Sequence, residues 1–257
     1  MPGRDIVRCA SPEVLAQSVA GRLATLIIDR QADGGSARIL LAGGAIVGRA
    51  LDAFASLPAL TGIDGRRVNV WWSDERFVPM GSQDRNDQRA WEIMRRVLGV
   101  PEHNLHRISG PQQAIGLEAA ARDYAVRLRA AALPEDHSEV PAFDVAVLSI
   151  GEDGHVASLF PEHPALHGTA SVVAVHAAPK PPSERVSLGL SSLCAAKEVW
   201  LLASGLQKAT AVRLMLDSTA GALQVPAAGV FGRVRTLLLA DEDAASRLPS
   251  DVGRPGG

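Results

Sequence analysis

Short apolar runs that alternate with helical stretches constrain the fold of this chain more than any other feature of its sequence. The runs are rich in valine, isoleucine and leucine, as are strands buried on both faces of a parallel sheet. They cover residues 37–42, 68–73, 143–150, 172–175, 199–203 and 235–240. Apolar residues at helical spacing occur in 11–27, 45–57, 87–98, 117–132 and 207–216. Strands joined by helices predict an α/β fold with a mainly parallel sheet flanked by helices.

The order of these elements does not divide the chain into separate domains. The sequence has no repeat, no low-complexity tract and no stretch with the composition of a linker. We therefore predict a single domain over residues 1–257, with a loose C-terminal tail over about 248–257, which ends in Gly-Arg-Pro-Gly-Gly. No long heptad pattern demands a partner chain, so we expect a monomer.

Charge and cysteine content narrow the function classes. The formal net charge is -2, which gives the chain no bulk attraction to nucleic acid or to an anionic membrane. No apolar run approaches the roughly 18 residues that a membrane span needs, and no secretory signal is evident. Cys9 and Cys194 are too few for a disulfide framework. We expect a cytoplasmic protein without a nucleic-acid or membrane partner.

Two polar loops follow the first two apolar runs. In parallel sheets, ligands bind beyond the carboxyl ends of the strands, so such loops are candidate sites. The Gly43-Gly44 pair precedes a helix, whose free N–H groups can bind an anion, although such a pair is more often a plain turn. The second loop contains Asp74, Glu75 and Arg76, and fits either an anion site or a surface ion-pair cluster.

A third loop, Gly-Glu-Asp-Gly-His over residues 151–155, directly follows a buried strand. Histidine is the residue type best suited to general acid–base catalysis at neutral pH, so His155 is the candidate base. Asp153 is close enough in sequence to orient the imidazole or to line a pocket. The glycine-flanked context favours a functional histidine over a structural one.

A fourth loop, Pro179-Lys180-Pro181-Pro182, is followed by Arg185. The prolines stiffen the backbone and reduce the entropy lost when Lys180 binds an anion. A solvated basic turn is the alternative. Together the four loops describe a pocket for a phosphorylated small molecule.

Several common catalytic motifs are missing from the sequence. It has no GxxxxGK[ST] loop, no GxGxxG after the first strand and no GxSxG elbow. It has no HExxH or CxxC pair, and a proline separates His163 from His167. We therefore expect no metal site.

The four loops in this order resemble those of the short, single-domain 6-phosphogluconolactonases, which are related to glucosamine-6-phosphate deaminases. The resemblance covers nearly the whole chain. It rests on Gly43-Gly44, on Ser73-Asp74-Glu75-Arg76 with Val78-Pro79, Ser82 and Asn86, on Gly151-x-Asp153-Gly154-His155-x-Ala157-Ser158-Leu159-Phe160-Pro161, and on Pro179-Lys180-Pro181-Pro182-x-x-Arg185.

The resemblance implies a Rossmann-like fold of the deaminase/lactonase type. It also implies hydrolysis of 6-phosphogluconolactone, the second step of the oxidative pentose phosphate pathway, without a cofactor. His155 would be the base, with Asp153 beside it. The substrate and its phosphate would be bound by Gly43, Gly44, Asp74, Arg76, Lys180 and Arg185.

The chain departs from the family pattern at three positions. Ala42 and Ala45 flank the glycine pair where the family usually has hydroxyl residues, and Ser149 stands where it usually has glycine. Ser149 fits if it keeps ordinary strand dihedrals.

Two other functions compete with lactone hydrolysis. A deaminase would carry Phe-Asn-Glu-Pro where this chain has Ser158-Leu159-Phe160-Pro161, and an aromatic residue at Arg76. A sugar-phosphate sensor of a transcription regulator would need a separate DNA-binding segment, for which the sequence shows neither spare length nor basic character.

Overall fold

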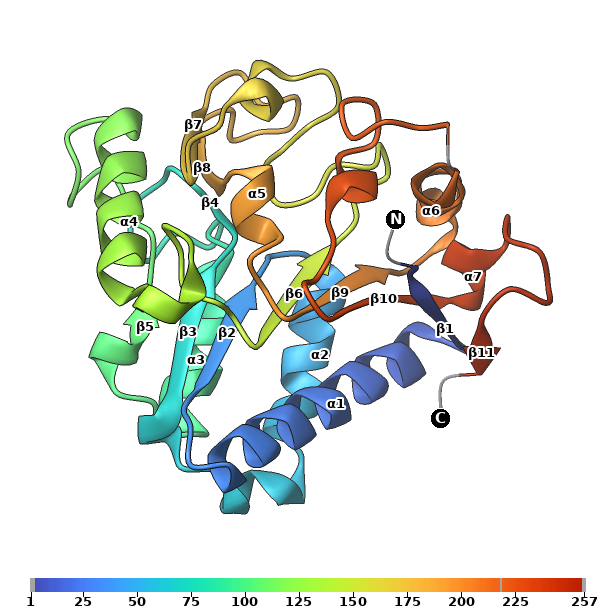
Figure 1. Cartoon of the computed structure of the whole chain (residues 1–257), viewed down its shortest axis with the longest axis horizontal. Coiled ribbons are helices and arrows are strands. Elements are labelled where there is room, and N and C mark those ends of the chain that lie inside the picture. The colour runs from blue at the N-terminus through green and yellow to red at the C-terminus, as the bar shows by residue number, and fades with distance from the viewer. Residues whose placement is uncertain (1–2, 218, 256–257) are drawn as a thin grey trace.

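The predicted parallel sheet forms the centre of the molecule. A computed structural model describes residues 3–217 and 219–255 (Figure 1). The strands of the large sheet are β1 (Asp5–Cys9), β2 (Ala37–Leu41), β3 (Val68–Trp72), β5 (Leu105–His106), β6 (Val145–Ser149), β9 (Glu198–Ala203), β10 (Arg235–Asp241) and β11 (Arg254–Pro255). Their order is β11-β1-β10-β9-β6-β2-β3-β5, and all neighbours run parallel. The α/β fold with a mainly parallel sheet is therefore confirmed, and the sequence analysis missed β1, β5 and β11.

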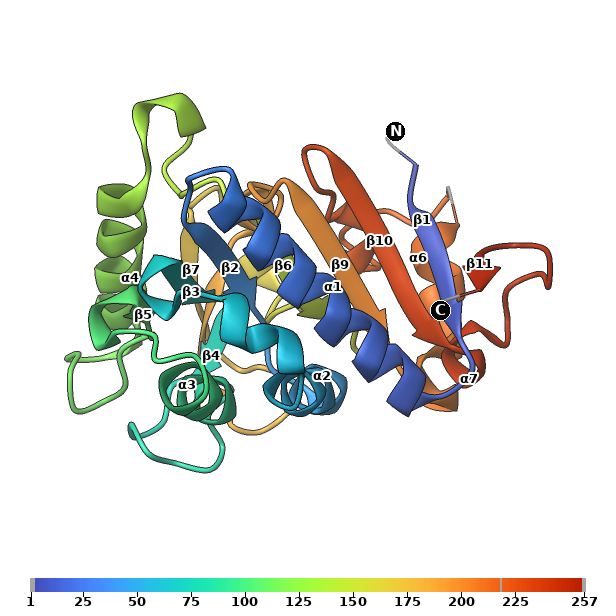
Figure 2. The same cartoon turned by 90° about the horizontal axis from the view of Figure 1, so that it is seen from below.

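Helices flank the large sheet. They are α1 (Pro12–Ala32), α2 (Ala45–Ala55), α3 (Asp87–Arg96), α4 (Leu117–Ala131), α5 (Leu190–Leu193), α6 (Ala209–Leu216) and α7 (Glu242–Ala245). The first begins as predicted, because Ser11 Oγ caps it by accepting a hydrogen bond from the N–H of Val14. Figure 2 shows α1 crossing the large sheet, and Figure 1 shows α1 and α2 on one side of it. The predicted helix over 207–216 begins instead with a 3₁₀ turn, Leu206–Lys208.

A small antiparallel sheet lies on the other side of the large one (Figure 1). It contains β4 (Asp74–Arg76), β8 (Arg185–Leu188) and β7 (Val172–Val175), in that order. Only β7 was predicted, and residues 74–86 were expected to form a loop throughout. The charged residues of β4 give it no strand-like pattern in the sequence. Asp74 and Glu75 are nevertheless buried, because they form hydrogen bonds and ion pairs with their neighbours.

The C-terminal segment is attached to the edge of the large sheet. Its β11 pairs with β1, at Val7 and Arg8. The Arg8 side chain donates to the carbonyls of Pro249 and Val252 at 2.7 and 2.8 Å. These contacts connect the described part of this segment to β1, and the loose tail from about residue 248 stays a prediction.

Within the described residues, no helix is both long enough and apolar enough to span a bilayer.

Candidate active site

The loops that follow β2, β3 and β6 meet at the carboxyl edge of the large sheet. They surround a cavity of about 100 Å³. Of the residues singled out in the sequence, it is lined by Gly43, Gly44, Asp74, Arg76, His155 and Arg185; Ala42, Asn86, Ser149 and Ala157 complete the lining. The parallel order of the strands explains this convergence, because their carboxyl ends share one edge.

His155 is held by its own loop. Its Nδ1 lies 2.5 Å from Oδ1 of Asp153, which also accepts the backbone N–H of His155 at 3.2 Å. A Cβ at Gly151 would fall 2.0 Å from Nδ1, so only glycine leaves room for the imidazole here. Burial would raise the pKa of Asp153, but the hydrogen bond and charge of His155 lower it to about 2. An ionised carboxylate at Nδ1 favours the proton on that nitrogen and leaves Nε2 as the basic atom.

Asp74 is buried, and both of its carboxylate oxygens accept hydrogen bonds. Its Oδ1 accepts from Ser73 Oγ at 3.0 Å, and its Oδ2 accepts from Ser158 Oγ at 2.7 Å. The amide of Asn86 lies 3.4 Å from Oδ2. Asp74 therefore ties β4 to the loop that carries His155, and fixes the distance between the two walls of the cavity.

Two guanidinium groups lie on the same side of the cavity. The pairing of β4 with β8 places Arg76 opposite Arg185. Arg76 Nη1 donates to the carbonyl of Asp84 at 2.5 Å, and Arg185 Nη2 donates to the carbonyl of Lys180 at 2.8 Å. Burial lowers the pKa of Arg185, although the charge of Asp74 opposes this. Two ordered arginines next to His155 favour an anionic or strongly polarised ligand.

A larger cavity of about 420 Å³ adjoins the first, and the two share Gly44 and Ser149. It exposes the first residues of α2, whose N-cap Gly44 provides no side chain to satisfy the free N–H groups. Lys208 also lines it. Burial lowers the pKa of Lys208, and the charge of Lys180 lowers it further. A helix N-terminus beside an ammonium group is suited to a phosphate.

Sequence reasoning missed Lys208. The available signal was its position three residues after Gly205, where β9 gives way to α6. Lys180, which was proposed, lines neither of these cavities. Its Nζ instead pairs with Glu152 Oε1 at 2.6 Å. Lys180 thus lies beside the His155 loop, close enough for its charge to act on Lys208.

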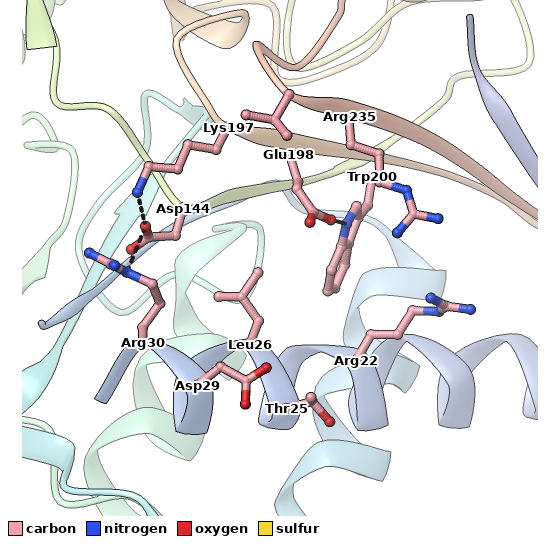
Figure 3. A pocket seen from close by; sticks show the side chains of 11 residues that line it. Arg22, Thr25, Leu26, Asp29, Arg30, Asp144, Lys197, Glu198, Trp200 and Arg235 are labelled. Atoms are coloured by element: carbon pink, nitrogen blue, oxygen red, sulfur yellow. Dashed lines mark hydrogen bonds and ion pairs between the residues drawn. The ribbon is translucent and has the colours of Figure 1, made fainter. Parts of the chain in front are cut away.

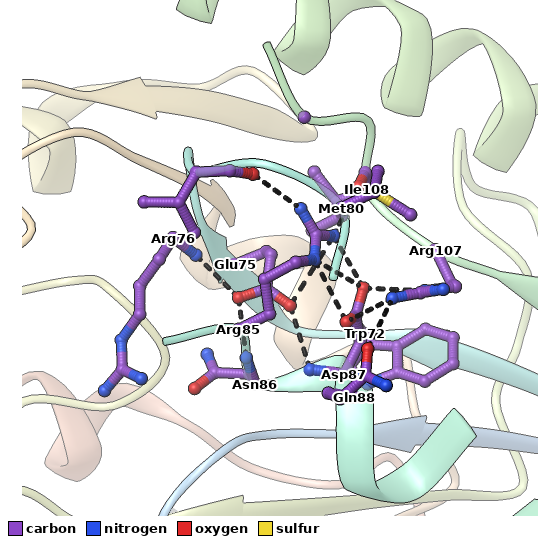
Figure 4. Close-up of polar contacts among 12 residues, drawn as sticks. Trp72, Glu75, Arg76, Met80, Arg85, Asn86, Asp87, Gln88, Arg107 and Ile108 are labelled. Atoms are coloured by element: carbon purple, nitrogen blue, oxygen red, sulfur yellow. Dashed lines mark hydrogen bonds and ion pairs between the residues drawn. The ribbon is translucent and has the colours of Figure 1, made fainter. Parts of the chain in front are cut away.

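A buried ion network supports this wall of the site (Figure 4). Arg85 donates to Asp87 at 2.6 Å and lies 3.7 Å from Glu75, and Arg107 pairs with Asp87 at 2.8 Å. Glu75 also accepts the backbone N–H groups of Asp87, Asn86 and Arg76 at 2.8 to 2.9 Å. These bonds fix the start of α3 and leave the Arg76 side chain pointing away from the network (Figure 4).

The network predicts a pH dependence of stability. Burial and the charge of Asp87 raise the pKa of Glu75 from 4.5 to about 8, despite the opposing charge of Arg85. The folded state then binds this proton more tightly than the unfolded state, so the contribution to stability is complete below pH 4.5 and is lost as the pH rises towards 8. We expect the melting temperature to fall by a few degrees from pH 5 to 8, and Glu75→Gln to remove this slope. Thermal unfolding measured from pH 5 to 8 tests this prediction. An equal dependence of the melting temperature on pH in the wild-type protein and in Glu75→Gln would contradict it.

A further cavity, of about 450 Å³, lies at the opposite edge of the sheet between α1 and the starts of β9 and β10 (Figure 3). Asp144 pairs there with Lys197 at 2.9 Å and with Arg30 at 3.0 Å. This cavity shares no lining residue with the one around His155. Among the described residues, no group of three or more histidine, cysteine or acidic side chains could hold a metal ion.

Comparison with known proteins shows the family of the chain. The family model described as glucosamine-6-phosphate isomerases/6-phosphogluconolactonase matches residues 10–238. The 6-phosphogluconolactonase of Streptomyces coelicolor is 46% identical over 246 residues, which are 95% of this chain and 94% of that protein. The Mycobacterium tuberculosis 6-phosphogluconolactonase is 40% identical over 241 residues, covering 93% of this chain and 96% of that protein. The solved 6-phosphogluconolactonase of Trypanosoma brucei is 25% identical with a TM-score of 0.80, covering 96% of this chain and 99% of that one. The chain therefore belongs to the glucosamine-6-phosphate isomerase/6-phosphogluconolactonase family.

Proposed function

We propose that this protein hydrolyses 6-phospho-D-glucono-1,5-lactone to 6-phospho-D-gluconate, the second step of the oxidative pentose phosphate pathway. The observation that carries the proposal is the imidazole of His155, held by the Asp153 carboxylate, in a cavity that adjoins a larger one lined by Arg49 and Lys208. Lactonases of this name at 40 and 46% identity support it.

The two cavities suit the two ends of such a substrate. We assign the phosphate to the larger cavity, where the N–H groups at the start of α2 and the ammonium of Lys208 can bind it. The lactone ring then extends past Gly44 into the smaller cavity. Lys180 can bind the phosphate if its ammonium group exchanges the ion pair with Glu152 for one with the phosphate.

His155 acts as a general base in this proposal. Its Nε2 removes a proton from water as the water oxygen attacks the lactone carbonyl carbon, and Asp153 stabilises the imidazolium that forms. When the bond between the carbonyl carbon and the ring oxygen breaks, the imidazolium returns the proton to that oxygen. Arg76 and Arg185 are placed to stabilise the negative charge of the tetrahedral intermediate. Asp74 holds the cavity walls together and borders the substrate.

The proposal is tested by following lactone made freshly from glucose 6-phosphate by its dehydrogenase. We expect its disappearance to be faster with this protein than spontaneously. No acceleration would overturn the proposal. Release of ammonia from glucosamine 6-phosphate would then assign the deaminase reaction, and binding of sugar phosphate without turnover would assign a sensor.

Lys208→Ala tests the assignment of the phosphate. Loss of a charge-assisted contact is expected to raise KM for the phosphorylated lactone about tenfold or more, with little change in kcat. Initial-rate kinetics check this against Lys197→Ala, which removes an ammonium group at the opposite edge of the sheet and leaves KM unchanged. An equal KM in the two variants would refute the role of Lys208.

A further inference from the structure

Ser149 lies at the junction of the two cavities. It is the last residue of β6, pairs in register with Leu202 and lines both cavities together with Gly44. The φ of Ser149 is not positive, so this serine keeps ordinary strand geometry. Any ligand that places its phosphate in one cavity and its ring in the other must pass over this residue.

The shape of the junction brings the Ser149 hydroxyl next to the space above Gly44. The φ of Gly44 is +111°, and a Cβ built there would lie 2.8 Å from Ser149 Oγ. The missing side chain thus leaves a space within hydrogen-bond distance of that hydroxyl. The turn itself supplies no hydroxyl, because its flanking residues are Ala42 and Ala45.

The hydroxyl of Ser149 can change partners. It donates to the carbonyl of Gly43 at 3.0 Å, which is long for a bond between two oxygens. A phosphate oxygen carries negative charge and forms a shorter, stronger hydrogen bond than a neutral carbonyl does. The other hydroxyl that lines the larger cavity, that of Ser204, already donates to the carboxylate of Asp241 at 2.6 Å.

We propose that Ser149 is a substrate-binding residue whose hydroxyl donates a hydrogen bond to the phosphate of the substrate at the junction of the two cavities. This inference rests on the proposed function and adds one phosphate-binding residue to it. Ser149 supplies from β6 a hydroxyl that the Gly43-Gly44 turn lacks, and it thereby contributes to selectivity for a phosphorylated lactone.

Ser149→Ala tests the proposal by titration with 6-phosphogluconate and with inorganic phosphate. Loss of one hydrogen bond to an anion is expected to weaken the binding of both about tenfold. We expect KM for the phosphorylated lactone to rise in parallel, and the melting temperature of the free protein to stay unchanged, because the junction keeps its backbone. Ser56→Ala is the matched control, since Ser56 Oγ also donates to a backbone carbonyl, that of Asp52, on the exposed end of α2.

The outcomes separate this proposal from the proposed function. If the wild-type protein hydrolyses the lactone and Ser149→Ala binds both anions as tightly as the wild type does, the role of Ser149 is refuted and the proposed function stands. The same holds if Ser149→Ala only lowers kcat and the melting temperature, because that marks a structural residue. If the wild-type protein neither hydrolyses the lactone nor binds 6-phosphogluconate, the proposed function fails and this inference with it.

Discussion

His155→Ala is expected to lower kcat for lactone hydrolysis by about 10²–10⁴-fold, the usual contribution of a positioned general base. KM should change little, because the phosphate is bound in the adjoining cavity, which His155 does not line. The size of the loss depends on the contact with Asp153, which leaves Nε2 as the basic atom. Initial rates, corrected for spontaneous hydrolysis, provide the measurement.

An exposed histidine provides the control. His103 lies in the 3₁₀ turn before β5 and lines neither of the two cavities, so His103→Ala should retain the wild-type kcat. A kcat of wild-type size in folded His155→Ala protein would remove His155 from the mechanism. A loss that appears only in KM would make His155 a binding residue instead.

Arg85→Ala is expected to destabilise the fold by about 3–5 kcal/mol, because it leaves the buried carboxylate of Asp87 and the buried carboxyl group of Glu75 without the cation that they share. The side chains of Arg85 and Asp87 are 0% exposed and that of Glu75 is 1% exposed, so water cannot replace the lost guanidinium. For a chain of this size the melting temperature should fall by roughly 6–20 °C. Arg107 retains its pair with Asp87 and limits the loss.

Arg95→Ala, a change on α3, is the matched control. Its guanidinium pairs with Glu102 at the surface, and removal of such an exposed pair changes stability by about 1 kcal/mol or less. Both variants are compared by thermal unfolding at one pH. Equal melting temperatures would show that the buried network contributes no more than a surface pair.

The fold could be predicted because its strands are apolar and its helices are periodic. Stretches such as 199–203 and 237–240 contain apolar residues alone, which is how a strand covered on both faces appears in a sequence. The small sheet escaped prediction for the opposite reason. Its β4 consists of three charged residues, of which Asp74 and Glu75 become buried only through partners outside the strand, including Ser158 and Arg85.

The candidate site was predicted in part because parallel strands bring their following loops to one edge. This rule placed Gly43, Arg76 and His155 together. It could not identify Lys208, whose loop has no dense cluster of charge or glycine, nor show that Lys180 pairs with Glu152. Those contacts depend on side-chain directions, which no local pattern in the sequence encodes.

The connection between Asp74 and Ser158 has a consequence for how activity appears during refolding. These residues are 84 positions apart, and the phosphate cavity adds Lys208 from still later in the chain. Ordering such distant segments requires closing long loops, an entropic penalty that local helix formation does not carry. A refolding chain can therefore bury Trp71 and Trp72 on β3 before any catalytic geometry exists. Recovered turnover then reports the completed long-range contacts of the site, which burial of Trp71 and Trp72 does not report.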